Sequence, residues 1–137
     1  MKSAYCASKF AVRGFTDSLR QELRPWGMQV AVVEPGAIAT PMWDKGRQTA
    51  NEYAEQLPST GRELYGGAVL AMQRTTEQMA RRAVPPEKVA RAVEHALTAR
   101  RARARYVVGL DARAQLALKA LLPTRAMDGL VARVMGL

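Results

Sequence analysis

Residues 27–36 read GMQVAVVEPG, a short apolar and β-branched run bounded by Gly27 at one end and by Pro35 and Gly36 at the other. A run of this length and composition is typical of a strand that is covered on both faces, as strands of parallel sheets are. We therefore predict a buried parallel strand over residues 28–34, ending at the Pro-Gly pair.

A helix is predicted immediately before this strand, over residues 3–24. Its apolar residues recur at spacings of seven, three, four and four, which forms one stripe along a helix. The residues of the stripe are Tyr5, Val12, Phe15, Leu19 and Leu23. Pro25 disfavours helical geometry in the residue before it, so we expect the helix to end near Arg24.

The segments after the strand predict a crossover to a second strand. Residues 36–66 contain Pro41, Pro58 and several glycines, and we interpret them as a loop-and-helix excursion of the kind that forms mobile lids. The remaining predicted elements are helix 67–82 with Val69, Met72 and Met79 inward, helix 86–99, strand 105–109, helix 112–122 capped by Asp111, and helix 124–135.

A strand, its helices and a second strand imply a parallel sheet. Two strands do not make a stable sheet by themselves. We therefore expect a partner segment that supplies the other strands.

Composition favours a soluble intracellular protein. The 137 residues are 48% hydrophobic and 24% charged, as in ordinary globular domains. No apolar run approaches the ~18 residues of a membrane span, and the N-terminal residues lack the apolar core of a signal peptide. The single cysteine, Cys6, cannot form an internal disulfide, so we expect a reducing cytoplasmic location and a buried thiol.

The net charge of +9 is concentrated toward the end of the chain, where residues 101–137 carry seven basic and two acidic side chains. The densest run is RRARAR at 100–105. Such a run can meet phosphates or an anionic membrane surface, whereas a solvated helix end is the simpler interpretation. No nucleic-acid motif accompanies it, so no nucleic-acid partner is predicted.

Tyr5 and Lys9 form a Y-x-x-x-K pair, and residues four apart share one face of a helix. A cation one turn away favours the phenolate, which makes a tyrosine more useful for moving protons. A core tyrosine followed by a solvated lysine is the structural alternative. Of the four tyrosines, only Tyr5 has a lysine four residues later.

A second candidate group follows the strand, at residues 35–40. Ligands of open parallel sheets bind beyond the carboxyl ends of the strands. Gly36 lets the backbone approach a planar ligand, while backbone groups near Ile38 and the Thr40 hydroxyl can bond an amide or a phosphate. A simple Pro-Gly turn is the alternative.

Taken together, YCASKF (5–10), EL (22–23) and VEPGAIATPM (33–42) resemble the catalytic half of the short-chain dehydrogenase/reductases, with a match that runs from Ser3 to about Met42. The resemblance implies that Tyr5 is the general acid/base and that Lys9 assists it and binds the nicotinamide ribose. It also implies two further groups of residues. The nicotinamide is lined by Pro35, Gly36, Ile38 and Thr40, and the substrate is bound by Met42 and Trp43.

The chain departs from the family pattern by lacking the glycine-rich G-x-x-x-G-x-G turn, the Asn-Ala-Gly segment and the upstream catalytic serine; Ser3 and Ser8 lie too close to Tyr5 to match that serine. We therefore expect residues 1–137 to form the C-terminal part of a single NAD(P)-binding, Rossmann-like doubly wound α/β domain. Two strands and five or six helices are expected, with 36–82 as the substrate lid and little activity for this chain alone.

The resemblance implies an oxidoreductase that interconverts a secondary alcohol and a carbonyl with NAD or NADP, the choice staying open. The similarity to steroid- and retinol-dehydrogenase-like members implies a small lipophilic substrate. The alternative is a non-catalytic, truncated homologue that assembles through helix 3–24 or the basic tail. No metal site is predicted, because His95 is the only histidine and is expected at the surface, and Glu34 is expected to be an ion-pair partner.

Overall fold

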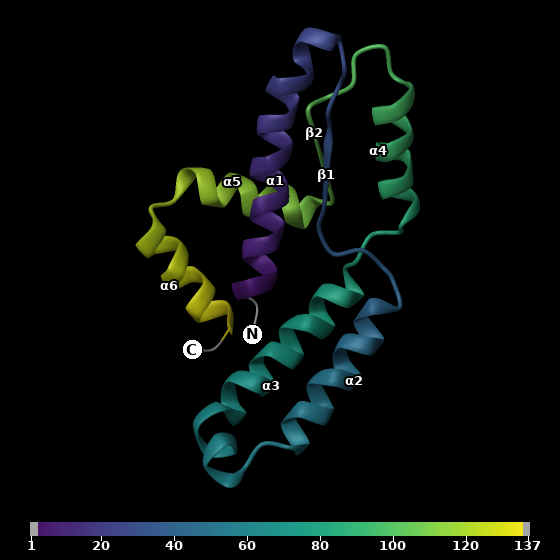
Figure 1. The fold of residues 1–137 in the computed structure, drawn as a ribbon. Helices are drawn as coiled ribbons and strands as arrows, with labels where there is room; N and C mark the ends of the chain where they lie inside the picture. Colours follow the sequence, from purple (N-terminus) through teal and green to yellow (C-terminus); the bar gives the residue numbers. More distant parts are fainter. Residues whose placement is uncertain (1–2, 136–137) are drawn as a thin grey trace. The chain divides into compact units, whose positions relative to one another are not determined.

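The computed structural model describes residues 3–135, which divide into two compact units (Figure 1). The strand unit comprises residues 3–35 and 87–108. The helical unit comprises residues 36–86 and 109–135. The chain passes between the units at Pro35–Gly36, at Pro86–Glu87 and at Val108–Gly109.

The strand unit is built around two parallel strands. Its elements are α1 (Ser3–Leu23), the 3-10 turn η1 (Arg24–Trp26), β1 (Val32–Pro35), α4 (Glu87–Thr98) and β2 (Arg105–Val108). The strands pair in register from Val32 opposite Arg105 to Pro35 opposite Val108, and α4 contacts both of them. The predicted parallel α/β crossover is confirmed.

The strand β1 is shorter than the prediction of 28–34. The residues just before β1 are held by a side chain and not by backbone pairing. The Gln29 amide donates to the Arg100 carbonyl at 3.2 Å and accepts from the Ala102 N–H at 2.8 Å. Regular pairing begins where the Val32 N–H donates to the Ala104 carbonyl at 3.0 Å. Gln29, the polar residue within the apolar run, therefore shifts the start of the strand to Val32.

The end of α1 follows the prediction. The α-helix stops at Leu23, Pro25 lies within η1, and Gly27 adopts a left-handed conformation with φ of 69°. A glycine accepts this conformation without steric cost, which lets the chain reverse toward β1.

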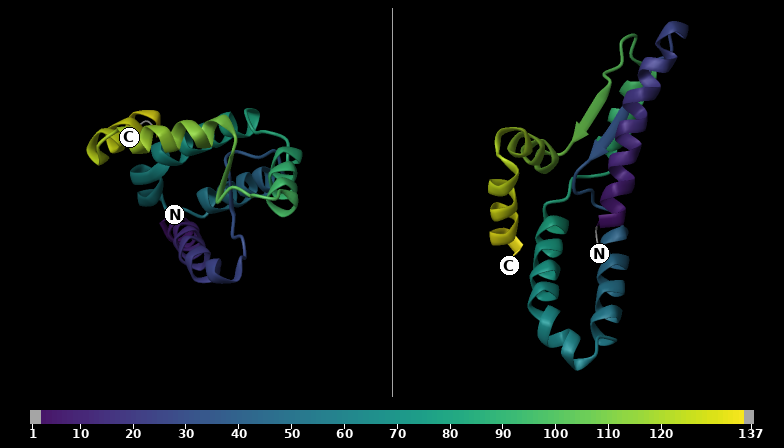
Figure 2. Two further views of the ribbon diagram at one scale, coloured as in Figure 1. Left: turned by 90° about the horizontal axis from the view of Figure 1, so that it is seen from above. Right: turned by 60° about the vertical axis from the view of Figure 1, so that its left-hand side comes forward.

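The helical unit contains α2 (Met42–Glu55), α3 (Ser59–Arg81), α5 (Leu110–Leu121) and α6 (Thr124–Met135). The helices α2 and α3 lie side by side as a hairpin (Figures 1 and 2). Helices therefore occupy more of residues 36–66 than the predicted loop-and-helix excursion implied. Pro41 and Pro58 occupy the positions just before the two helices, where proline starts a helix without breaking it.

The first residues of the helical unit contact Val84 and Asp111, and we call this pair of contacts the bracket. Ile38 forms an isolated parallel bridge with Val84, and the Asp111 carboxylate accepts a hydrogen bond from the Ala37 N–H at 2.7 Å. The prediction that Asp111 caps the following helix is wrong, because α5 begins one residue earlier, at Leu110, with no side-chain cap. The carboxylate is turned toward residue 37 instead.

Few side chains are buried within residues 3–135. Tyr106 and Val108 of β2 are the buried hydrophobic residues, and Thr16 is a buried polar one whose hydroxyl donates to the Val12 carbonyl at 2.7 Å. Two predictions of inward residues are wrong: Cys6 is exposed, and half of Met79 is exposed. Of the helices described, none combines the length and apolarity needed to cross a bilayer.

Gly109 provides a test of the bracket. Its φ is 110°, and a Cβ placed there would collide with the Asp111 carboxylate. We expect Gly109→Ala to lower the free energy of unfolding by about 2 kcal/mol, because a side chain is strained in this conformation. Chemical denaturation followed by circular dichroism measures the effect.

The matched control is Gly46→Ala in α2, where a Cβ would meet no atom within 4 Å. This variant should gain about 0.5–1 kcal/mol of stability, since alanine favours helix over glycine. Equal changes in the free energy of unfolding of the two variants would contradict the strain assigned to a side chain at position 109.

Candidate functional site

Tyr5 and Lys9 lie on successive turns of α1, in the strand unit. The Lys9 ammonium nitrogen is 5.2 Å from the centre of the Tyr5 ring, which is a cation–π contact. The Ser8 hydroxyl donates to the Tyr5 backbone carbonyl at 2.8 Å, within the same helix. Tyr5 is 61% exposed, so its phenol group is open to a reactant.

Arg13 continues the same face of α1, one turn beyond Lys9. Its guanidinium lies 3.7 Å from one Glu34 carboxylate oxygen, and the other oxygen accepts from the Arg105 side chain, whose Nε is at 2.5 Å. Glu34 therefore bridges α1 to the paired strands, which confirms its prediction as an ion-pair partner. Arg20 adds a second tie, because its Nε donates to the Val30 carbonyl at 3.2 Å.

These contacts link α1 to β1 and to the residues just before it through Arg13 and Arg20. Charged hydrogen bonds between partly buried groups are stronger than neutral ones. The sequence offered no local signal for this bridge, because Arg13, Glu34 and Arg105 are far apart along the chain and basic residues on a helix are usually solvated.

The candidate residues after the strand fall in two groups. Pro35 is the exposed last residue of β1, in the strand unit, whereas Gly36 opens the helical unit. A Cβ added at Gly36 would collide with the Asp111 carboxylate. The glycine is therefore needed for close packing at this turn, and Asp111 is a residue that the sequence did not single out for the site.

Ile38, Thr40 and Trp43 are joined by hydrogen bonds within the helical unit. The Trp43 indole N–H donates to the Ile38 carbonyl at 2.6 Å, and the Trp43 backbone N–H donates to the Thr40 carbonyl at 3.3 Å. The Ile38 carbonyl is thus already engaged by protein. Met42 is exposed beside them at the start of α2.

An open groove of about 400 Å³ lies between α2 and α3. It is lined by both helices, through Trp43, Asp44, Arg47, Thr76, Glu77, Ala80 and Arg81. A neighbouring, more polar groove of about 590 Å³ shares Asp44, Arg47 and Glu77 with it. Of the predicted substrate residues, Trp43 reaches a groove and Met42 does not.

Among residues 3–135, no group of three His, Cys, Asp or Glu side chains is placed to hold a metal ion. His95 is exposed, as the sequence predicted, and it also contacts a neighbouring strand. Its Nδ1 lies 2.8 Å from the Tyr106 hydroxyl, which also accepts from the Arg103 N–H at 3.0 Å. The histidine therefore supports the buried tyrosine of β2.

The short chain dehydrogenase family model matches residues 1–51, which include every candidate residue from Tyr5 to Trp43. Retinol dehydrogenase 5 of Mus musculus is 37% identical over 132 residues, covering 93% of this chain and 42% of the relative. The chain belongs to the short-chain dehydrogenase/reductase family.

Other relatives of this short-chain dehydrogenase/reductase chain come from bacteria. The uncharacterized oxidoreductase YbbO of Escherichia coli K12 is 35% identical over 127 residues, covering 93% of this chain and 40% of the relative. The NADPH-dependent 3-dehydrocapnine reductase of Ornithobacterium rhinotracheale is 31% identical over 128 residues, with 93% and 43% covered.

The chain thus spans about two fifths of the length of the curated relatives it matches, and it aligns with their C-terminal part. The parallel β1–β2 pair with six α-helices is consistent with part of the Rossmann-like fold of the family. The predicted family and fold class are confirmed.

Proposed function

We propose that this chain carries the proton-transfer part of an NAD(P)-dependent oxidoreductase that interconverts a secondary alcohol and a carbonyl. The observation that supports the proposal most directly is the Tyr5–Lys9 pair on one face of α1, with the ammonium against the exposed phenol ring. A phenol beside a cation is a chemically suitable acid/base for an alcohol oxygen.

In this proposal Lys9 meets the ribose end of the cofactor, because its ammonium offers donors for the ribose hydroxyls. Gly36 is proposed to lie at the nicotinamide end. In this proposal Pro35, Ile38 and Thr40 complete the nicotinamide-lining set. Bound NAD(P) supplies or accepts the hydride.

The proton follows a path through Tyr5. In oxidation, the Tyr5 oxygen would take the hydroxyl proton of the alcohol. In reduction, Tyr5 returns the proton to the carbonyl oxygen. In this proposal the Lys9 ammonium beside the ring assists Tyr5 in both directions.

We further propose that residues 36–82 form the substrate lid of a single nucleotide-binding domain, with Met42 and Trp43 at the substrate. The α2–α3 hairpin and its grooves support this, because a helical hairpin presents side chains along its length. The name of retinol dehydrogenase 5 supports a small lipophilic alcohol as the substrate class. A cytoplasmic location is retained as an expectation from the single cysteine.

Cofactor titration of the 137-residue chain tests the nucleotide-binding part of the proposal. We expect NADH and NADPH to show no saturable fluorescence change at micromolar concentrations, because the sequence contains no glycine-rich turn for the pyrophosphate. Tight binding of either nucleotide would show that residues 3–135 hold the phosphates by another route. The difference between the two nucleotides would then answer whether NAD or NADP is used.

A non-catalytic assembly role is the second candidate, and the outward side of α1 favours it. Phe15 is 66% exposed and Val12 is more than half exposed on this helix. If α1 mediates self-association, Phe15→Ser should shift the chain to a smaller species in size-exclusion chromatography at micromolar concentration. Tyr5→Phe should leave the elution volume unchanged.

A further inference from the structure

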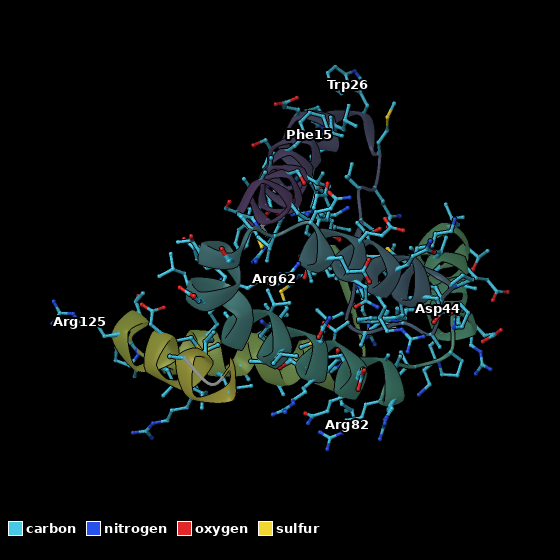
Figure 3. All side chains as sticks on the ribbon, turned by 90° about the horizontal axis from the view of Figure 1, so that it is seen from below. Phe15, Trp26, Asp44, Arg62, Arg82 and Arg125 are labelled. Carbon is cyan, nitrogen blue, oxygen red and sulfur yellow. The ribbon has the colours of Figure 1, made fainter. Side chains whose placement is uncertain are left out.

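The turn that joins α1 to β1 exposes apolar side chains beside a cation. Trp26 is 69% exposed and Met28 is 57% exposed, although both are large and apolar. Figure 3 shows the Trp26 side chain extending away from the ribbon. Arg24, two residues before the indole, is exposed as well.

A second turn, between α4 and β2, lies at the same end of the strand unit (Figure 1). Gln29 holds it there, because its amide bonds the Arg100 carbonyl and the Ala102 N–H. The exposed arginines of this turn, Arg100, Arg101 and Arg103, thus stand beside the turn that carries Trp26. We call the two turns together the tryptophan–arginine surface, comprising residues 24–28 and 100–103.

The charge of this surface is not neutralised by the protein. Among residues 3–135, none of its four arginines has a carboxylate within 4.0 Å, whereas Arg13, Arg20 and Arg105 of the same unit are paired. Glu22, in the last turn of α1, adds one negative charge nearby. Four positive charges against one leave a clearly cationic surface with an indole at its edge.

We propose that the tryptophan–arginine surface binds the surface of an anionic lipid bilayer. Indole rings favour the headgroup level, where the ring is partly apolar and its N–H is hydrated. Arginine side chains reach lipid phosphates with their guanidinium groups while their stems lie along apolar material. Cations near an anionic leaflet are attracted within a Debye length.

A lipid surface fits better than a nucleic acid. Arginine side chains contact the phosphates of lipids and of nucleic acids alike, so the exposed apolar side chains decide between the two. The exposed Met28 thioether also gains from an apolar medium but has no partner on a phosphate backbone. Trp26 and Met28 together therefore favour a bilayer.

This surface is separate from the proposed acid/base. Tyr5 and Leu23 are eighteen residues apart on α1, which is about 27 Å at a rise of 1.5 Å per residue. Binding a membrane through the turn at the far end of α1 therefore leaves Tyr5 and Lys9 uncovered. The proposal stands whether or not the chain carries out alcohol chemistry.

Vesicle co-sedimentation of the chain provides the test, with phosphatidylcholine vesicles compared with vesicles that also contain phosphatidylserine. We expect binding to the anionic vesicles alone, weakening by more than tenfold as the salt concentration rises from low to physiological, because the charges become screened. In a Trp43→Phe background, the emission of Trp26 should shift to shorter wavelength when the vesicles bind.

Two triple variants distinguish the contribution of the tryptophan–arginine surface to vesicle binding from that of the net charge of the chain. Replacing Arg100, Arg101 and Arg103 with glutamine should weaken binding by about a hundredfold, since each cation near the membrane contributes about fivefold. The control replaces Arg74, Arg81 and Arg82, which are exposed on and just after α3, and removes the same charge from the helical unit. It should change binding by less than about threefold, and circular dichroism checks that both variants keep their helices.

Trp26→Ala should weaken vesicle binding by at least fivefold and abolish the emission shift. The proposal is wrong if neither vesicle binds or if the two triple variants lose affinity equally. It is also wrong if a DNA oligonucleotide displaces the vesicles and binds Trp26→Ala as well as the parent chain, because the surface would then be a nucleic-acid site.

Discussion

Replacing Tyr5 with phenylalanine is expected to lower the rate of alcohol oxidation by about a thousandfold, in whichever form of the protein turns over an alcohol with NAD(P). The substitution keeps the ring that Lys9 contacts at 5.2 Å and removes only the hydroxyl. Without that oxygen, no group on this face of α1 accepts the substrate proton. Nucleotide binding should change little, because the ring and the ammonium remain. Initial rates of NAD(P)H formation with lipophilic secondary alcohols measure the effect.

Tyr65→Phe is the matched control, because Tyr65 is similarly exposed at 60% but lies on α3. We expect it to retain activity within about twofold, as surface substitutions usually do. Near-normal turnover by Tyr5→Phe would contradict the acid/base role. Equal losses in both variants would point to a general effect on the preparation and not to proton transfer.

Truncating Tyr106 to alanine is expected to lower the free energy of unfolding by about 3–4 kcal/mol. Only 8% of this residue is exposed, and it is one of two buried hydrophobic residues in the part of the chain described. Its ring packs edge-on against His95, with 5.6 Å between the ring centres. Removing the ring leaves a void between β2 and α4, since the helix and the strand meet there. Urea denaturation followed by circular dichroism measures the loss.

Tyr106→Phe separates the ring from its hydroxyl. This variant should cost about 1–2 kcal/mol, because the Arg103 N–H and the His95 nitrogen lose their shared partner while the packing survives. A result in which phenylalanine costs as much as alanine would show that the hydrogen bonds, and not the packing, hold β2 to α4.

Much of the strand unit was predictable because its signals are local. Apolar β-branched residues before Pro35 indicated β1, and Pro25 marked the end of α1. The delay of β1 to Val32 was not predictable, because it depends on bonds from Gln29 to a turn more than seventy residues later. No periodicity within residues 27–36 carries that information.

The helical unit was predicted less well for a related reason. Proline and glycine between residues 36 and 66 suggested loops with short helical patches, yet Pro41 and Pro58 precede long helices and Gly46 lies within one. Side chains expected inside, such as Cys6 and Met79, are exposed, since a helical stripe indicates a face but not what covers it. The Tyr5–Lys9 pair followed from four-residue spacing alone, whereas the Glu34 bridge required tertiary contacts.

The ion pairs of Glu34 with Arg13 and Arg105, which we call the Glu34 bridge, also constrain the order in which elements fold. Its partner Arg105 lies 71 residues later in the chain, so during synthesis α1 and β1 must wait for β2 before the bridge can form. The α2–α3 hairpin lies within that interval and needs only local contacts. A hairpin that folds first brings Pro35 and Glu87 closer than a random loop would, which lowers the entropy cost of closing the sheet. The α2–α3 hairpin would thus act as a folding aid for the pairing of β1 with β2.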